Sequence, residues 1–219
     1  RLNKPCMNNQ GLPEMTAEPV LHNARIVLAD EIVEGSLVLR DGFIAGIDAG
    51  AGRTGEDMGG DYIIPGLVEL HTDHLEGHYA PRPKVRWNPI AAVLAHDAQV
   101  ATAGITTVLD ALRAGLAAAA ALPLADIRKL ADAIEDSVQQ DRLRADHFIH
   151  LRCEVSAPDC LKAFGNFDGD ERVKLASLMD HAPGQRQFVN LETYAYYYQR
   201  KLKLTDRDFK VFCEKRMAE

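Results

Sequence analysis

The chain has 219 residues, of which 47% are hydrophobic and 26% are charged, a composition typical of a globular protein that buries a core. The formal net charge of −7 argues against nucleic acids and anionic membrane surfaces as partners. No apolar run approaches the roughly 20 residues of a membrane-spanning helix, and the first residues lack the apolar core of a signal peptide. The four cysteines are not spaced as a zinc cluster or a disulfide framework, so we expect a cytoplasmic location.

The N-terminal part of the chain predicts an irregular extension followed by a small β segment. Residues 1–19 are expected to be the irregular extension. Residues 20–60 are expected to form a small antiparallel β segment, because Asp41–Gly42 is a tight-turn dipeptide between apolar runs. The predicted strands of this segment are residues 20–28, 35–40 and 43–47, and residues 50–60 are predicted to be a loop.

From residue 61 to 219, longer apolar runs alternate with helical patterns. Tyr62–Leu70 is mostly apolar, which predicts a strand buried on both faces. Asn88 and Pro89 predict the start of a helix, and Gly104 its end. The β-branched run Ile105–Leu109 predicts a second strand. The apolar stripe expected on the helix consists of Ile90, Val93, Leu94, Ala98 and Ala101.

The alternation continues to the end of the chain. His147–Val155 predicts a third strand. Residues 173–181 fit either the end of a helix or a fourth strand, and we favour a strand for the second half, which ends at His181. Thr205 and Asp208 resemble a capping box that opens a last helix. The residues expected to face inward are Ile127, Leu130, Ala131, Ile134 and Val138 on the helix before the third strand, and Phe209, Phe212, Cys213 and Met217 on the last helix.

Strands that alternate with helices predict an α/β fold with a parallel sheet and right-handed crossovers. An open doubly wound sheet and a barrel both fit this pattern. A complete (β/α)₈ barrel takes about 250 residues, more than residues 61–219 provide. We therefore expect either the first part of such a barrel after the N-terminal β segment, or a different architecture.

The densest group of chemically active residues runs from His71 to His78, at the carboxyl end of the first predicted strand of this region. In parallel α/β folds, this end of the strands carries the active site. Residues two apart on a strand face the same way, so His71 and Asp73 should converge as ligands for Zn²⁺, Mn²⁺ or Fe²⁺. A solvated polar loop is the alternative, but three histidines and two carboxylates within this run favour a metal site.

Two further candidate ligands occupy comparable positions. Glu154 lies at the end of the third predicted strand, and His181 at the end of the fourth. Burying either group is costly unless it is paired or bound to a metal. The alternatives are a salt bridge of Glu154 with Arg152 or another arginine, and a solvated loop for His181.

Basic residues near these strand ends indicate an anionic substrate. Arg82, Lys84 and Arg86 lie in a proline-containing stretch directly after the histidine run, where three cations would suit a phosphate or phosphonate. A solvated surface loop explains them equally well. Arg113 and Arg186 are weaker candidates for the same role. The sequence has no GxGxxG, P-loop or GxSxG motif, which argues against a dinucleotide site, a Walker-type phosphate site and an α/β-hydrolase serine.

The segment from Ile64 to His71 resembles the first barrel strand of the amidohydrolase superfamily, whose pattern is Pro-Gly, an acidic residue and then histidine. Residues 20–60 resemble the small β-sandwich segment that flanks that barrel. The runs 71–76, 81–83, 150–155 and 179–188 together resemble one family, the ribose 1-methylphosphonate 5-triphosphate diphosphatases of the bacterial carbon–phosphorus lyase pathway. This resemblance implies metal-dependent hydrolysis of a phosphoric anhydride, with a phosphorylated ribose phosphonate as substrate and diphosphate as one product.

The resemblance also implies a site with one or two divalent ions, Zn, Mn or Fe. His71 and Asp73 would be ligands, with Asp73 in the place of the superfamily's second histidine. Glu154 would take the place of the bridging lysine carbamate, and His181 that of the next histidine ligand. His74 and Glu76 would support these ligands from the second shell. The aspartate that acts as general base in the superfamily is expected beyond residue 219, so no catalytic base is assigned within the chain.

Two other functions remain open from the sequence. One is an amidohydrolase of the dihydroorotase or deaminase kind, which acts on a cyclic amide or a nucleobase amine and needs no cluster of cations. The other is an inactive metal-binding fragment, because the last ligands of the superfamily pattern are absent from the sequence. Homo-oligomerisation and the identity of the metal are likewise open.

Overall fold

The computed structural model describes residues 18–50, 52, 54–82, 84–115, 122–185 and 189–218. The contacts divide the chain into two compact units, Arg1–Pro65 and Gly66–Glu219. Almost all of the predicted N-terminal extension lies outside the described residues. No helix in the described part is both long and apolar enough to cross a membrane.

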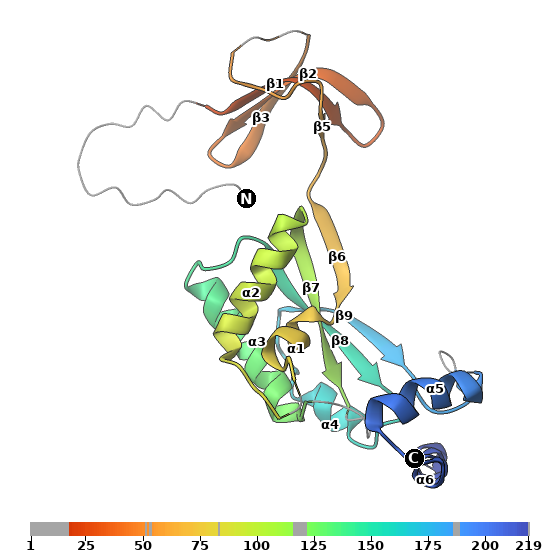
Figure 1. The fold of residues 1–219 in the computed structure, drawn as a ribbon. Helices are drawn as coiled ribbons and strands as arrows, with labels where there is room; N and C mark the ends of the chain where they lie inside the picture. The colour runs from red at the N-terminus through yellow and green to blue at the C-terminus, as the bar shows by residue number, and fades with distance from the viewer. Residues whose placement is uncertain are drawn as a thin grey trace. The chain divides into compact units, whose positions relative to one another are not determined.

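The first unit is a small sheet with strand order β3-β2-β1-β4, in which β5 also pairs with β1 (Figure 1). Asp41 and Gly42 have φ values of 51° and 79°, as a tight hairpin turn between β2 and β3 requires. The buried core of the first unit consists of Ala24, Ile26 and Leu37. The strands are β1 (Val20–Val27), β2 (Ile32–Arg40), β3 (Phe43–Ala49), β4 (Glu56–Asp57) and β5 (Tyr62–Ile63). The short strand β4 lies in the segment that was predicted to be a loop.

The second unit is a parallel sheet with strand order β6-β7-β8-β9, and its helices α2 and α3 lie together on one face (Figure 1). The strands are β6 (Leu67–Thr72), β7 (Ile105–Ala114), β8 (Asp146–Glu154) and β9 (Val173–Met179). The helices are α1 (His74–Tyr79), α2 (Pro89–Thr102), α3 (Leu124–Gln139), α4 (Cys160–Gly165), α5 (Leu191–Leu202) and α6 (Asp206–Ala218).

Two of the predicted helix starts are confirmed by their caps. The side chain of Asn88 accepts a hydrogen bond from the backbone N–H of Ala91, with Pro89 in the first helical position of α2. The hydroxyl of Thr205 accepts a hydrogen bond from the backbone N–H of Asp208 at the start of α6. Gly104, with φ of 79°, ends α2 in the left-handed conformation.

The single buried strand predicted at Tyr62–Leu70 is wrong in two respects. Tyr62 and Ile63 form β5 of the first unit, and a new strand begins only at Leu67. Leu67, Val68 and Leu70 are about half exposed or more. The physical reason is that β6 pairs only with β7 in the described sheet, so one of its edges is open and its side chains are incompletely covered.

Three predicted helix faces are also corrected. On α2, the buried residues include His96 and Asp97, whereas Ala98, which was expected inside, is exposed. Val138 of α3 and Met217 of α6 are exposed, although the other residues expected inward on these helices are buried or partly buried. Apolar spacing alone misplaces the face of α2, because two of its inward positions carry polar side chains that find buried partners.

The faces of the sheet have different chemistry. Ile149, Leu151 and Cys153 of β8 belong to the apolar core that includes residues of α2 and α3. Side chains alternate along a strand, so His150 and Arg152 point to the other face. We call this the open face. Leu112 and Ala114 of β7 lie in the same core, which places Arg113, between them, on the open face as well.

Candidate active site at the carboxyl ends of the strands

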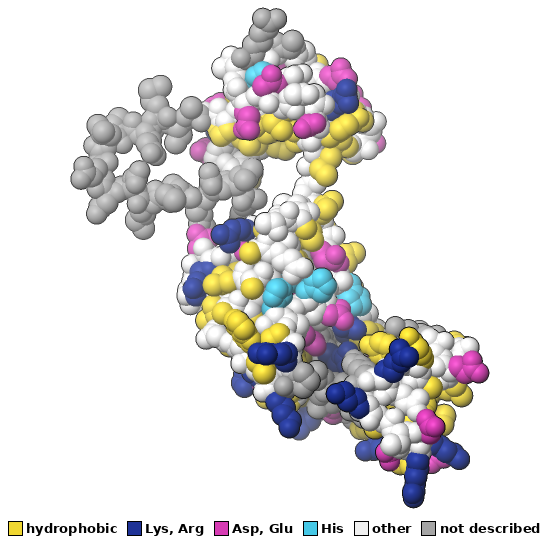
Figure 2. Space-filling view, viewed as in Figure 1, with side chains coloured by type: hydrophobic (Ala, Val, Ile, Leu, Met, Phe, Trp, Pro, Cys, Tyr) yellow, Lys and Arg dark blue, Asp and Glu magenta, His cyan; other side chains and the backbone are white. Residues whose placement is uncertain are grey.

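The four predicted metal ligands all lie at the carboxyl ends of strands. His71 is near the end of β6, Asp73 is the N-cap of α1, Glu154 is the last residue of β8, and His181 follows β9. In the space-filling view, exposed histidine side chains lie close together on the surface of the second unit (Figure 2). The structure brings the four residues together as two pairs.

The first pair is His71 and Asp73, which are about half exposed. The Nε2 atom of His71 lies 3.5 Å from Oδ1 of Asp73. The backbone N–H of His71 donates to the side chain of Glu69 over 2.8 Å, and its ring contacts that of His150 edge-on at 4.9 Å. His150 is itself anchored, since its Nδ1 lies 2.9 Å from the carbonyl oxygen of Leu70. The pair is therefore held on one side and open to solvent on the other.

The second pair is Glu154 and His181. Glu154 is fully buried, and one of its oxygens contacts Nδ1 of His181. The other oxygen accepts hydrogen bonds from the backbone N–H of His181 over 2.8 Å and from the hydroxyl of Ser156 over 2.9 Å. Burial by itself would raise the pKa of Glu154, but the hydrogen bonds from His181 and Ser156 outweigh it and lower the pKa to about 2. Glu154 is thus an ionised carboxylate in a buried place.

Arginines border both pairs. The Nη1 atom of Arg152 lies 2.6 Å from Oδ2 of Asp73, so the arginine that forms an ion pair with Glu154 is not Arg152 but another one, Arg216. Its Nε donates to the thioether sulfur of Met179 over 3.3 Å. Arg216, from α6, donates to Ser156 over 3.2 Å and lies 3.9 Å from Glu154. Helix α6 therefore reaches the end of β8.

The donor atoms suit a divalent ion, because each pair offers one imidazole and one carboxylate. Buried, ionised Glu154 has the form that metal ligation requires, and half-exposed Asp73 is accessible to an incoming ion. Within the described part of the chain, however, no three of the four lie within 4.8 Å of one another as ligand atoms. They form two half-sites and not one closed cage.

The predicted phosphate-binding cations are spread over different surroundings. Arg82 and Lys84 are exposed. Arg86 donates to Asp126 of α3 over 3.1 Å. Arg113, expected just after the second strand, lies within β7, and its Nε atom is buried without a hydrogen-bond partner among the described residues. Arg186 lies outside the described residues.

The two residues expected to support the ligands differ in environment. His74 is exposed, and its Nδ1 lies 3.3 Å from the amide nitrogen of Gln99. The Glu76 carboxyl is buried near Arg113 and Arg152, and burial raises its pKa in spite of these two cations. Glu76 therefore belongs to the charged group around Asp73, whereas His74 contacts α2.

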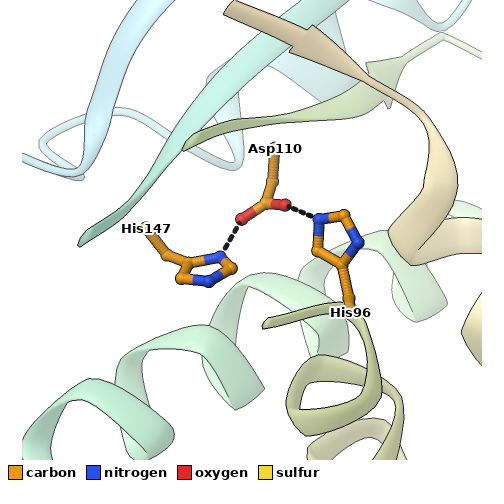
Figure 3. A group of neighbouring side chains, drawn as sticks. All are labelled: His96, Asp110 and His147. Carbon is orange, nitrogen blue, oxygen red and sulfur yellow. Dashed lines mark hydrogen bonds and ion pairs between the residues drawn. The ribbon is translucent and has the colours of Figure 1, made fainter. Parts of the chain in front are cut away.

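A second polar cluster was missed from the sequence. His96, Asp110 and His147 are buried on the face of the sheet that carries α2 (Figure 3). His147 Nδ1 lies 2.8 Å from Oδ2 of Asp110, and His96 Nε2 lies 2.8 Å from its Oδ1, the latter as an ion pair without hydrogen-bond geometry. The Nε2 atom of His147 lies 3.4 Å from Asp97. The only sequence signal was the polar pair His96–Asp97 inside an apolar helix.

This cluster has the donor types of a metal site but the arrangement of a polar network. Each imidazole approaches a different oxygen of Asp110, although one ligand atom from each of the three residues lies within 4.8 Å of the others. Burial by itself would lower the pKa of His147, but Asp110 and Asp97 outweigh it and raise the pKa to about 9. We interpret the cluster as a network that joins α2 to β7 and β8.

Comparison with known proteins supplies the context of the site. The alpha-D-ribose 1-methylphosphonate 5-triphosphate diphosphatase of Escherichia coli (strain K12) is 41% identical over 201 residues, which cover 91% of this chain and 53% of that protein. The chain therefore spans about half the length of this relative. An adenine deaminase of Desulfitobacterium hafniense (strain Y51) is 33% identical over 36% of this chain and 16% of its own length. No family model matches the chain.

Among solved structures, the N-acetyl-D-glucosamine-6-phosphate deacetylase from Mycobacterium smegmatis matches with a TM-score of 0.50 and 16% identity, over 77% of this chain and 45% of that one. An L-hydantoinase from Arthrobacter aurescens matches with a TM-score of 0.40 and 22% identity, over 70% and 31%. The chain is therefore similar in sequence to this diphosphatase and in fold to this deacetylase. The predicted α/β fold is confirmed, and the four-stranded parallel sheet is an incomplete barrel.

Proposed function

We propose that the chain contributes the first part of the active site of a metal-dependent diphosphatase. Its substrate would be alpha-D-ribose 1-methylphosphonate 5-triphosphate, and its products the 5-phosphate and diphosphate. The observation that carries this proposal is the 41% identity with the diphosphatase of Escherichia coli over 91% of the chain. The two imidazole–carboxylate pairs at the carboxyl ends of the strands support it, since amidohydrolases are metal-dependent.

His71, Asp73, Glu154 and His181 would hold the divalent ion or ions. Bound there, an ion would supply Lewis acidity toward water and toward a phosphoryl oxygen. Glu154 is prepared for this role because it is ionised and already held by His181 and Ser156. The half-exposed pair His71–Asp73 would complete the ligand set from the other side of β7.

The chain's cations would neutralise the substrate. A triphosphate carries several negative charges, and guanidinium and ammonium groups stabilise the charge that develops on the leaving diphosphate. Arg82 and Lys84 are exposed and accessible, whereas Arg86 would have to exchange its ion pair with Asp126 for one with the substrate. Arg113 and Arg186 would add further positive charge. Soluble phosphorylated substrates and the net charge of −7 fit a cytoplasmic enzyme without nucleic-acid partners.

A nucleobase amine is the second candidate substrate class, favoured by the partial match to adenine deaminases. ³¹P NMR of the intact gene product, supplied with Mn²⁺ or Zn²⁺ and the ribose phosphonate triphosphate, distinguishes the two. We expect diphosphate to appear while the methylphosphonate resonance persists. An untouched triphosphate beside measurable release of ammonia from adenine would replace the proposal with the second candidate. Loss of both activities in a protein that binds metal would indicate a non-catalytic fragment.

A further inference from the structure

Two arginines stand side by side on the open face of the sheet. Arg113 of β7 and Arg152 of β8 are direct partners in the parallel register, and both side chains project from the same face. Like charges directly opposite each other on neighbouring strands are destabilising. Their placement at the carboxyl ends of the strands therefore calls for a compensating negative charge.

The carboxylates nearby compensate only in part. Asp73 forms an ion pair with Nη1 of Arg152, but this nitrogen has no hydrogen-bond partner among the described residues, so the contact lacks hydrogen-bond geometry. Glu76 accepts a hydrogen bond from the backbone N–H of Arg113, but not from its guanidinium Nε. The Nε atom of Arg152 donates to the thioether of Met179, which is a weak acceptor.

The result is a group of buried donors without good acceptors. Arg152 has only 7% of its surface exposed, and the Nε atom of Arg113 is buried without a hydrogen-bond partner in the described part of the chain. Leaving a charged donor unsatisfied inside a protein costs more free energy than leaving a neutral donor unsatisfied. A guanidinium has five N–H donors in a planar fork that matches the oxygens of a phosphoryl group. Two such forks in register would bind two edges of one tetrahedral anion.

We propose that Arg113 and Arg152 together form an anion site for a phosphoryl group, beside the ion-binding pair His71–Asp73. This inference assigns Arg152 a binding role and rests on the proposed function for the identity of the anion, a phosphoryl group of the substrate or the diphosphate product. The short reach from Arg152 to Asp73, 2.6 Å, places the anion next to the candidate metal ligands.

The test is the binding of inorganic pyrophosphate to the intact gene product in the presence of a chelator, so that no metal links anion and protein. In ¹H–¹⁵N spectra of protein labelled at arginine, the Nε–H resonances of Arg113 and Arg152 should shift on titration, because these groups gain or exchange an acceptor. Spectra of R113Q and R152Q assign the two resonances. If neither resonance shifts at high pyrophosphate concentration, the proposal is overturned. This measurement uses the unaltered protein, so it does not depend on whether a variant folds.

Affinity measured by calorimetry gives the second readout. R113Q and R152Q should each weaken pyrophosphate binding at least tenfold, and R152K should recover only part of the loss, because an ammonium cannot bind through a fork. R128Q is the matched control, since Arg128 of α3 forms ion pairs with Asp132 of the same helix and with Asp170, which precedes β9. Equal affinities of R113Q, R152Q and R128Q would overturn the proposal. Pyrophosphate binding without turnover of the triphosphate would instead refute the proposed function and leave the anion site standing.

Discussion

At the scale of single residues, the site depends on how the surroundings set the charge of buried groups. Glu154 and His147 are both buried in the second unit, yet each is stabilised in its charged form by partners that outweigh the cost of burial. Glu154 faces the carboxyl end of the sheet, where that charge can serve a metal. His147 lies between two aspartates on the other face, where it serves stability.

Replacing Glu154 by Gln should abolish ligation while keeping the shape of the side chain. Removal of a residue that only supports a metal ligand typically lowers metal affinity by about 10–100-fold. We expect the loss in this variant of the intact gene product to be at least as large. Metal content after dialysis against Zn²⁺ or Mn²⁺ measures this loss directly. Glu135→Gln on α3, which removes a carboxylate that pairs with Arg172, is the control and should retain its metal. Full metal content in Glu154→Gln would remove Glu154 from the ligand set.

The pKa of His147 predicts a pH dependence of stability. Its pKa in the folded protein, about 9, lies above the ordinary value of 6.5, so the protonated form stabilises the folded state. This contribution is fully present below pH 6.5 and is lost as the pH rises through 9. Urea unfolding should show a lower free energy of unfolding at about pH 9 than at about pH 6. The variant His147→Gln should show a smaller difference between the two pH values. An equal slope in both proteins would contradict the assignment.

At the scale of elements, a few particular residues position strand β6, which carries His71, and the helices that follow it. Strand β6 starts directly after Gly66, and the backbone N–H of Leu67 donates to Gly104 over 2.9 Å. Helix α1 follows at once and turns the chain back, so that Asp73 and Glu76 stay close to the strand ends. Helix α2 is attached to the sheet through His96 and Asp97 as well as through apolar side chains.

Gly66 leaves no room for a side chain. A Cβ atom there would collide with the hydroxyl, the methyl group and the Cβ of Thr106 in β7. We expect Gly66→Ala to destabilise the protein by about 1–3 kcal/mol, the usual range for overpacking, because β6 must move away from β7. Thermal and urea unfolding measure the loss, and Gly46→Ala, which meets nothing within 4 Å, is the control. Equal losses in the two variants would show that packing against Thr106 does not limit this position.

At the scale of the whole molecule, the barrel segment has two open edges in its described sheet. Strands β6 and β9 each pair with one neighbour only. Val68 and Leu70 on β6 and Leu178 on β9 expose more than half of their surfaces. Exposed apolar edge strands are templates for association with other chains.

The 219-residue chain should therefore self-associate in solution through these edges. Replacing Leu178, which is 72% exposed, by Lys should raise the monomer fraction in sedimentation experiments, because an inward or edge charge blocks pairing. Leu161→Lys is the control, since this residue is 87% exposed but lies on α4 and not on a strand. A monomeric wild-type chain at high concentration would contradict this expectation.

Much of this architecture was determined by the sequence on its own. Local signals suffice for the Asp41–Gly42 hairpin, the caps of α2 and α6, and the alternation that defines β8, because each depends on neighbours in the chain. The same holds for the location of His71, Asp73, Glu154 and His181 at the carboxyl ends of strands. Their role as ligands is still a prediction, and so is that of the basic residues.

Only the tertiary structure decided which of these residues meet. Arg152 pairs with Asp73 and not with Glu154, its neighbour two residues away, because the loop after β6 brings Asp73 over the sheet. His96, Asp110 and His147 come from three elements far apart in the chain, so no local pattern joins them. The exposure of β6 likewise follows from its place at the edge of the sheet. Contacts between distant segments depend on how the whole sheet packs, and the apolar periodicity of the sequence does not indicate them.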